Sequence, residues 1–140
     1  MITAIDTNVI IALWNRDEAL SSATQAALDA ALAQGSLVIC GPVFAELLAA
    51  PLRTEAFLNS FFADTGISIE WELTEEIWRA AGRSFQKYAA RRRKHGDSGP
   101  RRILADFLIG AHASERGYRL LTLDERLYRA AFPRITITRI

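Results

Sequence analysis

The sequence predicts a single α/β domain with a mostly parallel central sheet flanked by helices on both faces. Three observations predict this class. A chain of 140 residues is long enough for one hydrophobic core and short for two. Half of the residues are apolar and 24% are charged, which is ordinary for a globular domain. Short apolar runs alternate with longer helical patterns over the whole length, and this alternation is typical of βαβ units with parallel strands.

The short apolar runs are expected to be strands, because each is brief and bounded by turn or helix signals. The expected strands cover residues 2–5, 37–39, 67–69, 120–122 and 135–137. Between them, helices are expected directly after residue 5, from a cap at Asp17 or Ser21/Ser22 to Gly35, from residue 41, at about 53–63, from residue 74, and at 103–115 and 125–131. Gly66 and Gly117 follow two of these helices and are expected to end them.

The turn-rich segment 95–100 is expected to be a mobile loop within the domain, so the whole chain, residues 1–140, is interpreted as one domain. No apolar run approaches the roughly 20 residues that span a bilayer, which excludes a membrane protein of the helical class. The chain opens directly on a strand pattern, which leaves no room for a signal peptide and predicts a cytoplasmic protein. Cys40 is the single cysteine, so an internal disulfide and a cysteine-based zinc site are excluded.

The formal net charge of +1 indicates no particular partner, but the basic residues are clustered. The cluster consists of Arg91, Arg92, Arg93, Lys94, Arg101 and Arg102, opposed by Asp97. Such a run is often only a solvated face. Because the guanidinium fork suits phosphate, it is also a candidate site for an RNA backbone.

Acidic residues follow the expected strands at positions where open parallel sheets bind ligands. Asp6 follows the first strand and Asp124 follows the fourth. Glu46 lies about one turn into the helix after the second strand, and Asp106 lies early in the nearly apolar helix at 103–115. A carboxylate among apolar neighbours needs a cation or several hydrogen bonds. Gly110, one turn after Asp106, is expected to leave space beside it.

Four oxygen-donor side chains with no cysteine or histidine nearby favour a hard ion, Mg²⁺ or Mn²⁺, over zinc. Each acid also has a simpler explanation. Asp6 and Asp124 are possible helix N-caps, and the helix dipole alone favours Glu46. The cap explanation is weakest for Asp106, because a cap should precede the apolar run that contains it.

In this order, the motifs resemble those of PIN-domain nucleases, and the chain length resembles VapC toxins of VapBC toxin–antitoxin pairs. The matching motifs are Asp6-Thr7-Asn8, Glu46, the run ADFLIGAHA at 105–113, and LTLD at 121–124. The resemblance covers essentially the whole chain. Leu123 departs from the basic or small residue usual in the last motif, and the motif leaves open whether Glu125 replaces or assists Asp124.

The resemblance implies that Asp6, Glu46, Asp106 and Asp124 bind one or two metal ions and form the catalytic site. It implies that Asn8 and Thr122 support them by hydrogen bonds to a carboxylate or to metal-bound water. The implied activity is metal-dependent endoribonuclease cleavage by an activated water. A second carboxylate is expected to act as general base, and Glu46 is preferred for this role. His112 is expected to be a surface or RNA contact, and not a metal ligand.

The resemblance also implies a cognate antitoxin, an RNA substrate and a homodimer. Three alternatives stay open. A PIN nuclease could process RNA without an antitoxin, and a binding module could keep the fold without the chemistry. An aspartyl-phosphate domain also places an acid after its first strand, but it generally needs a second aspartate two residues on, where this chain has Asn8.

Overall fold

The computed structural model describes residues 1–96 and 101–140, and in this part of the chain five strands form one parallel sheet of order β3-β2-β1-β4-β5. The strands are β1 (Ile2–Ile5), β2 (Ser36–Cys40), β3 (Ser68–Glu70), β4 (Arg119–Leu121) and β5 (Thr136–Thr138). The helices are α1 (Thr7–Leu13), α2 (Glu18–Gln34), α3 (Gly41–Leu48), α4 (Glu55–Thr65), α5 (Glu75–His95), α6 (Leu104–Arg116) and α7 (Glu125–Ala131). The predicted α/β class with a parallel central sheet is confirmed.

The helix boundaries follow from local capping. The Asp17 carboxylate accepts hydrogen bonds from the backbone N–H groups of Ala19 and Leu20, so Asp17 and not the later serines caps α2. Thr54 caps α4 in the same way, and this helix therefore begins later than the expected residue 53. Gly66 has a φ of 72° and ends α4 in the left-handed conformation that glycine adopts without strain.

The remaining differences from the predicted elements are small. α6 begins at Leu104 instead of residue 103, and β5 begins one residue later than expected. Residues 97–100 of the expected mobile loop lie outside the described residues, while His95 is the last residue of α5. No helix in the described ranges combines the length and the apolar character needed to cross a membrane.

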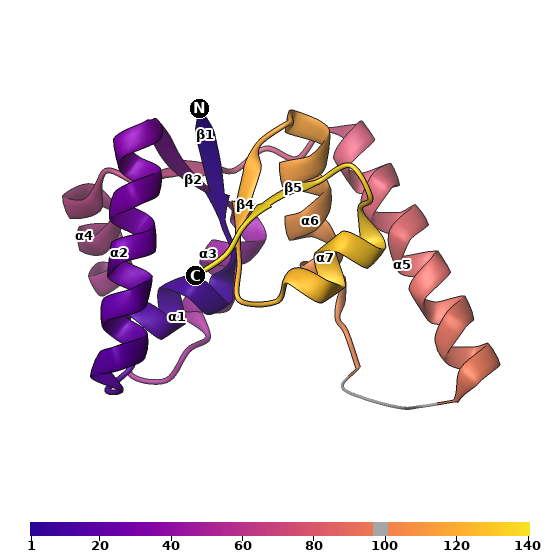
Figure 1. The fold of residues 1–140 in the computed structure, drawn as a ribbon, viewed down its shortest axis with the longest axis horizontal. Coiled ribbons are helices and arrows are strands. Elements are labelled where there is room, and N and C mark those ends of the chain that lie inside the picture. Colours follow the sequence, from indigo (N-terminus) through magenta and orange to yellow (C-terminus); the bar gives the residue numbers. More distant parts are fainter. Residues whose placement is uncertain (97–100) are drawn as a thin grey trace.

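The order of the strands determines where a ligand site is expected. The chain adds β2 and β3 on one side of β1 and then returns to add β4 on its other side. A parallel sheet binds ligands beyond the carboxyl ends of its strands, at the point where the strand order reverses. Here that point lies beyond the ends of β1 and β4. Figure 1 shows these central strands between α2 and α4 at one end of the molecule and α5 at the other.

Buried aliphatic side chains hold this edge in place. Ile5, Ile10, Ile39, Val43 and Leu47 are each at most 1% exposed and belong to one hydrophobic core. They lie on β1, α1, β2 and α3, the elements that surround the carboxyl ends of the central strands. The backbone that presents the acidic residues is therefore packed on a rigid base.

Candidate active site

Asp6 lies at the centre of the acidic edge. It follows β1, its backbone N–H donates to the carbonyl of Leu121 at 3.0 Å, and its side chain is 4% exposed. The Thr122 hydroxyl donates to Asp6 Oδ2 at 2.7 Å, and the same hydroxyl accepts the backbone N–H of Asp124 at 2.9 Å. Although Asp6 precedes α1, its side chain makes no capping hydrogen bond. Thr122 thus ties Asp6 to the turn that carries Asp124.

Burial makes the negative charge of Asp6 unfavourable. It raises the pKa of this carboxyl from 3.8 to about 6, and the charge of Asp106 adds to the effect, while the Thr122 hydroxyl opposes it. In the part of the chain that the structure describes, no cation is among the groups that shift the pKa of Asp6. A divalent cation would supply a compensating positive charge, and an all-carboxylate site suits a hard ion.

Asp106 lies in the first turn of α6, and its Oδ2 accepts the backbone N–H of Ile103 at 3.3 Å. Ile103 and not Asp106 is the N-cap of α6, as the sequence argument expected, but the Asp106 carboxylate at the third helical position still bonds the N-cap backbone. Burial raises the pKa of Asp106, the charge of Asp124 raises it further, and the charge of Arg102 lowers it. Asp106 and Asp124 are thus close enough to repel each other.

The space expected beside Asp106 is filled. A Cβ atom on Gly110 would lie 2.3 Å from the Phe132 ring and 3.0 Å from the Tyr128 ring. Gly110 lacks a side chain because α7 and the residue that follows it pack directly against α6. The missing side chain of Gly110 therefore allows α6 and α7 to pack closely, and it does not open space beside the Asp106 carboxylate.

Asp124 is held by an arginine. Its Oδ2 lies 2.6 Å from the guanidinium of Arg102, and the side chain makes no capping bond at the start of α7. The backbone N–H of Arg102 donates to the Tyr88 hydroxyl on α5 at 2.6 Å. Of the basic residues predicted to bind RNA, Arg102 is the one that the described structure pairs with these acids. Arg91, Arg93, Lys94 and Arg101 are exposed, and Arg92 lies with its guanidinium carbon 5.7 Å from the Tyr88 ring centre.

Glu46 and Asn8 complete the predicted set. The Thr7 hydroxyl donates to Glu46 Oε1 at 2.6 Å, and the charges of Glu46 and Asp6 both raise the pKa of the buried Cys40 thiol between them in the chain. The Asn8 side chain accepts the backbone N–H of Leu123 at 3.3 Å, so it holds the turn before Asp124 instead of a carboxylate.

Glu125 is engaged elsewhere. Its two carboxylate oxygens lie 2.6 Å from Arg129 Nε and 2.7 Å from Arg139 Nε. In the described ranges, no three side chains of the Asp, Glu, His and Cys types lie close enough together to hold a metal ion. The acids share one edge of the sheet, but Asp124 faces Arg102 and Glu46 faces Thr7.

Tyr128 was missed by the sequence reasoning. It lies on α7, is 1% exposed, and its hydroxyl has no hydrogen-bond partner of ordinary geometry in the described part of the chain. It is nevertheless close enough to Asp6 to lower the pKa of that carboxyl. Burial raises the pKa of Tyr128, and the charges of Asp6, Asp106 and Asp124 raise it further. The signal available in the sequence was its position one turn after Asp124 on the same helix face.

The expectation for His112 is wrong. Its side chain is 1% exposed, and its Nε2 lies 2.7 Å from Glu70 Oε1 on β3. Tyr118 donates its hydroxyl to the other Glu70 oxygen at 2.8 Å, and Arg116 lies 3.5 Å from Glu70 Oε1. His112 is therefore the buried member of a partly exposed polar cluster and does not form a surface contact.

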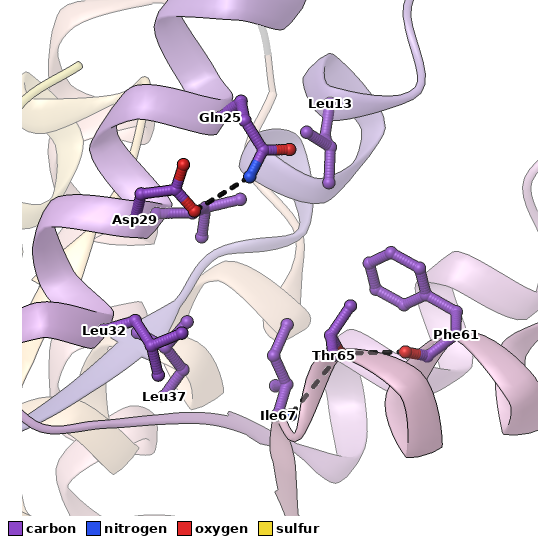
Figure 2. Close-up of a pocket in the computed structure, with 9 residues that line it drawn as sticks. Leu13, Gln25, Asp29, Leu32, Leu37, Phe61, Thr65 and Ile67 are labelled. Carbon is purple, nitrogen blue, oxygen red and sulfur yellow. Dashed lines mark hydrogen bonds between the residues drawn. The ribbon is translucent and has the colours of Figure 1, made fainter.

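A cavity of about 230 Å³ lies away from the acids, between α2, α4 and the amino ends of β2 and β3. Figure 2 shows its apolar lining from Leu13, Leu32 and Phe61, with the hydrogen bond from Gln25 to Asp29 (2.9 Å) at its rim. None of the four predicted metal ligands, Asp6, Glu46, Asp106 and Asp124, lines it. The chemistry of the acidic edge is therefore separate from this cavity.

Comparisons with known proteins agree with the fold. Residues 3–133 match the family model of the PIN domain. Among solved structures, VapBC2 from Rickettsia felis bound to a DNA fragment from their promoter gives a TM-score of 0.69 at 18% identity, covering 99% of this chain and 98% of that one. VapBC-1 from nontypeable Haemophilus influenzae gives 0.68 at 20% identity, with coverage of 99% and 98%.

FitAcB from Neisseria gonorrhoeae gives a TM-score of 0.63 at 19% identity, covering 98% of this chain and 96% of that one. No curated protein sequence matches the chain significantly. These identities show a shared fold, and the family match covers nearly all of the sequence. The chain belongs to the PIN domain family.

Proposed function

We propose that this protein is a Mg²⁺- or Mn²⁺-dependent endoribonuclease and the toxin of a type II toxin–antitoxin pair. The observation that carries the proposal is the excess of buried or half-buried carboxylates at the reversal point of a parallel sheet, where Asp6 and Asp106 both have raised pKa values. Such perturbed groups cluster at functional sites. The membership in the PIN family supports the same assignment.

Asp6, Asp106 and Asp124, together with Glu46, are the residues proposed to hold the metal. When bound, a divalent cation would supply a water of lowered pKa and neutralise charge on the phosphoryl oxygens. Thr122 fixes the rotamer of Asp6 through its 2.7 Å hydrogen bond. Glu46 is the proposed general base, and the hydrogen bond from Thr7 orients its carboxylate.

The basic residues at the end of α5 and after it are proposed to bind the RNA backbone. Arg91, Arg93, Lys94 and Arg101 are exposed and carry charge that phosphate can reach. Contacts of this kind add affinity that falls with salt and contribute little choice of sequence. The RNA is therefore proposed to be selected by its shape.

The antitoxin is a proposal supported by similar proteins, and the homodimer is a proposal that follows from the sequence resemblance alone. Of the similar structures above, two are VapBC proteins, and the one from Rickettsia felis is bound to a DNA fragment from their promoter. By likeness of fold, we propose that a small DNA-binding antitoxin inhibits this chain in the cytoplasm. Expression of the chain alone is expected to arrest bacterial growth, and Asp106→Asn is expected to relieve the arrest. Growth arrest by both the wild-type chain and Asp106→Asn, or by neither of them, would count against a toxin that acts through this site.

The direct test is cleavage of a mixed RNA pool by the purified chain with Mg²⁺ or Mn²⁺. Asp106→Asn is the test variant and Asp29→Asn is the matched control, because Asp29 bonds Gln25 on α2 and lies at the separate cavity. We expect cutting that EDTA abolishes, that Asp106→Asn loses and that Asp29→Asn keeps. Folded protein that cuts no RNA with either metal would favour a binding module with the same fold.

A further inference from the structure

The guanidinium of Arg102 lies against the carboxylate of Asp124, which is one of the proposed metal ligands. It lies 2.6 Å from Asp124 Oδ2, and its charge also lowers the pKa of Asp106. A basic side chain and a divalent cation both bind carboxylate oxygens, so they compete for the same lone pairs. Arg102 therefore supplies positive charge to the acidic edge from within the chain.

The backbone of Arg102 is held in place by a hydrogen bond, so its side chain extends toward Asp124 from a fixed position. The Tyr88 hydroxyl accepts the Arg102 backbone N–H at 2.6 Å, and the stacked rings of Tyr88, Phe85 and Phe107 tie that hydroxyl to α5 and α6. The Arg102 and Asp124 side chains are only 30% and 27% exposed. A pair covered to this degree is screened less by solvent than an ordinary surface ion pair.

The pairing also engages one of the proposed metal ligands. In the described ranges no three potential ligands converge, although Asp6, Asp106 and Asp124 interact electrostatically at one edge. Asp124 lies close enough to Asp106 for the two charges to repel each other, but its Oδ2 is bound to Arg102. Releasing that bond would free one carboxylate for the site.

We propose that Arg102 is an internal counter-ion that holds Asp124 in the metal-free protein and must release it when a divalent cation binds. Arg102 thereby sets the metal concentration at which the site fills. The inference rests on the proposed metal site but assigns Arg102 a role that RNA binding does not require. It makes Arg102 a positioning residue that acts through Asp124.

The test is the dissociation constant of Mn²⁺ for the full-length chain, measured by isothermal titration calorimetry without RNA. Arg102→Gln is expected to bind Mn²⁺ about tenfold more tightly, which corresponds to about 1.4 kcal/mol for a partly buried ion pair. Arg102→Lys keeps the positive charge but not the planar guanidinium, and its dissociation constant for Mn²⁺ is expected to lie between those of the wild-type chain and Arg102→Gln. Arg126→Gln removes an exposed arginine two residues from Asp124 and should change the constant by less than about twofold.

A double-mutant cycle separates competition for Asp124 from a general effect of charge. In the Asp124→Asn background, Arg102→Gln is expected to have no more effect than Arg126→Gln. Wild-type or weaker affinity in Arg102→Gln overturns the proposal, and so does an equal gain with and without Asp124. If the wild-type chain binds Mn²⁺ and cuts RNA but Arg102→Gln binds no more tightly, only the role of Arg102 is lost. If no variant binds Mn²⁺, the proposed metal site is lost as well.

Discussion

Two clusters of charged side chains lie at opposite ends of α6, and they are balanced in opposite ways. Near the end of the helix, Glu70 is bound by His112, Tyr118 and Arg116, and these partners hold its pKa below the usual value despite burial. At the start of the helix, Asp6 and Asp106 repel each other and have raised pKa values. The first cluster is satisfied by the chain, while the second has more negative charge than the described part of the chain compensates.

This difference separates a structural cluster from a site that needs a ligand. A carboxylate whose hydrogen bonds and charge are already satisfied stabilises the fold. Carboxylates held together without sufficient positive charge destabilise the metal-free protein, and a bound cation reverses that effect. The same helix therefore carries one cluster that supports the fold and one proposed to act in catalysis.

The largest effect is expected at Asp124, and its neighbour Glu125 provides the matched control. Asp124→Asn should lower RNA cleavage about a hundredfold or more, because Asp124 faces Asp106 at the proposed metal site. Glu125→Gln should change cleavage by less than about threefold, because both Glu125 oxygens pair with exposed arginines. The measurement is the initial rate of RNA cleavage by each variant at saturating Mn²⁺. A larger loss in Glu125→Gln would mean that the fourth acid is Glu125.

Asp6→Asn should stabilise the metal-free protein at neutral pH by up to about 3 kcal/mol, since the pKa of Asp6 rises from 3.8 to about 6 on folding. Below pH 3.8 the carboxyl is protonated in both states, so the variant gains nothing there. As pH rises from 3.8 through 6, the wild-type protein loses stability relative to the variant. Urea unfolding in EDTA at several pH values measures this difference.

Saturating Mn²⁺ should then stabilise the wild-type protein more than Asp6→Asn. A variant that is less stable than wild type at pH 8 without metal would show that Asp6 is already satisfied by Thr122 and Tyr128. In that case the contrast between the two clusters would fail.

Gly110→Ala tests the packing that holds both clusters in place. The added Cβ would lie 2.3 Å from the Phe132 ring, so we expect a loss of about 1–3 kcal/mol in the free energy of unfolding. Gly82→Ala is the matched control in α5, where a Cβ meets nothing within 4 Å, and it should stabilise the protein by about 0.5–1 kcal/mol. Equal effects in chemical denaturation would mean that α7 does not pack tightly on Gly110.

Glu70→Gln has the smallest expected effect, a loss of about 1–2 kcal/mol in stability with unchanged RNA cleavage per folded molecule. Because the pKa of Glu70 is below its ordinary value of 4.5 in the folded state, this stabilisation is complete above pH 4.5. It is lost as pH falls through the lowered pKa. Thermal unfolding at pH 7 and pH 3 compares the two conditions, and a cleavage defect in this variant would give the Glu70 cluster a role in catalysis.

The order of the elements could be predicted from the sequence because strand and helix patterns alternate clearly and glycines or capping residues separate them. Asp6 could be placed for the same reason, since it follows a short apolar strand directly. Thr122 follows β4 in parallel register with β1, and this register brings its hydroxyl to Asp6. Residues that directly follow a short apolar strand can therefore be placed from the sequence pattern alone.

The contacts that decide charge balance could not be predicted, because they join residues far apart in the chain. His112 was expected at the surface, but it lies on a helix that is apolar on nearly every side. Its side chain is hydrogen-bonded to Glu70, which is 42 positions away in the sequence. Gly110 was expected to leave space, and the ring of Phe132 fills it. The bond between Arg102 and Asp124 likewise depends on how Tyr88 anchors the start of α6, which no spacing in the sequence indicates.

The most direct test of the metal site is a crystal structure of the full chain grown with Mn²⁺, with the ion located by its anomalous scattering. We predict an ion bound by Asp6, Asp106 and Asp124, with the Arg102 guanidinium moved away from Asp124. An ion bound elsewhere, or an empty acidic edge in which Arg102 still pairs with Asp124 at saturating Mn²⁺, would contradict the proposed metal-dependent nuclease.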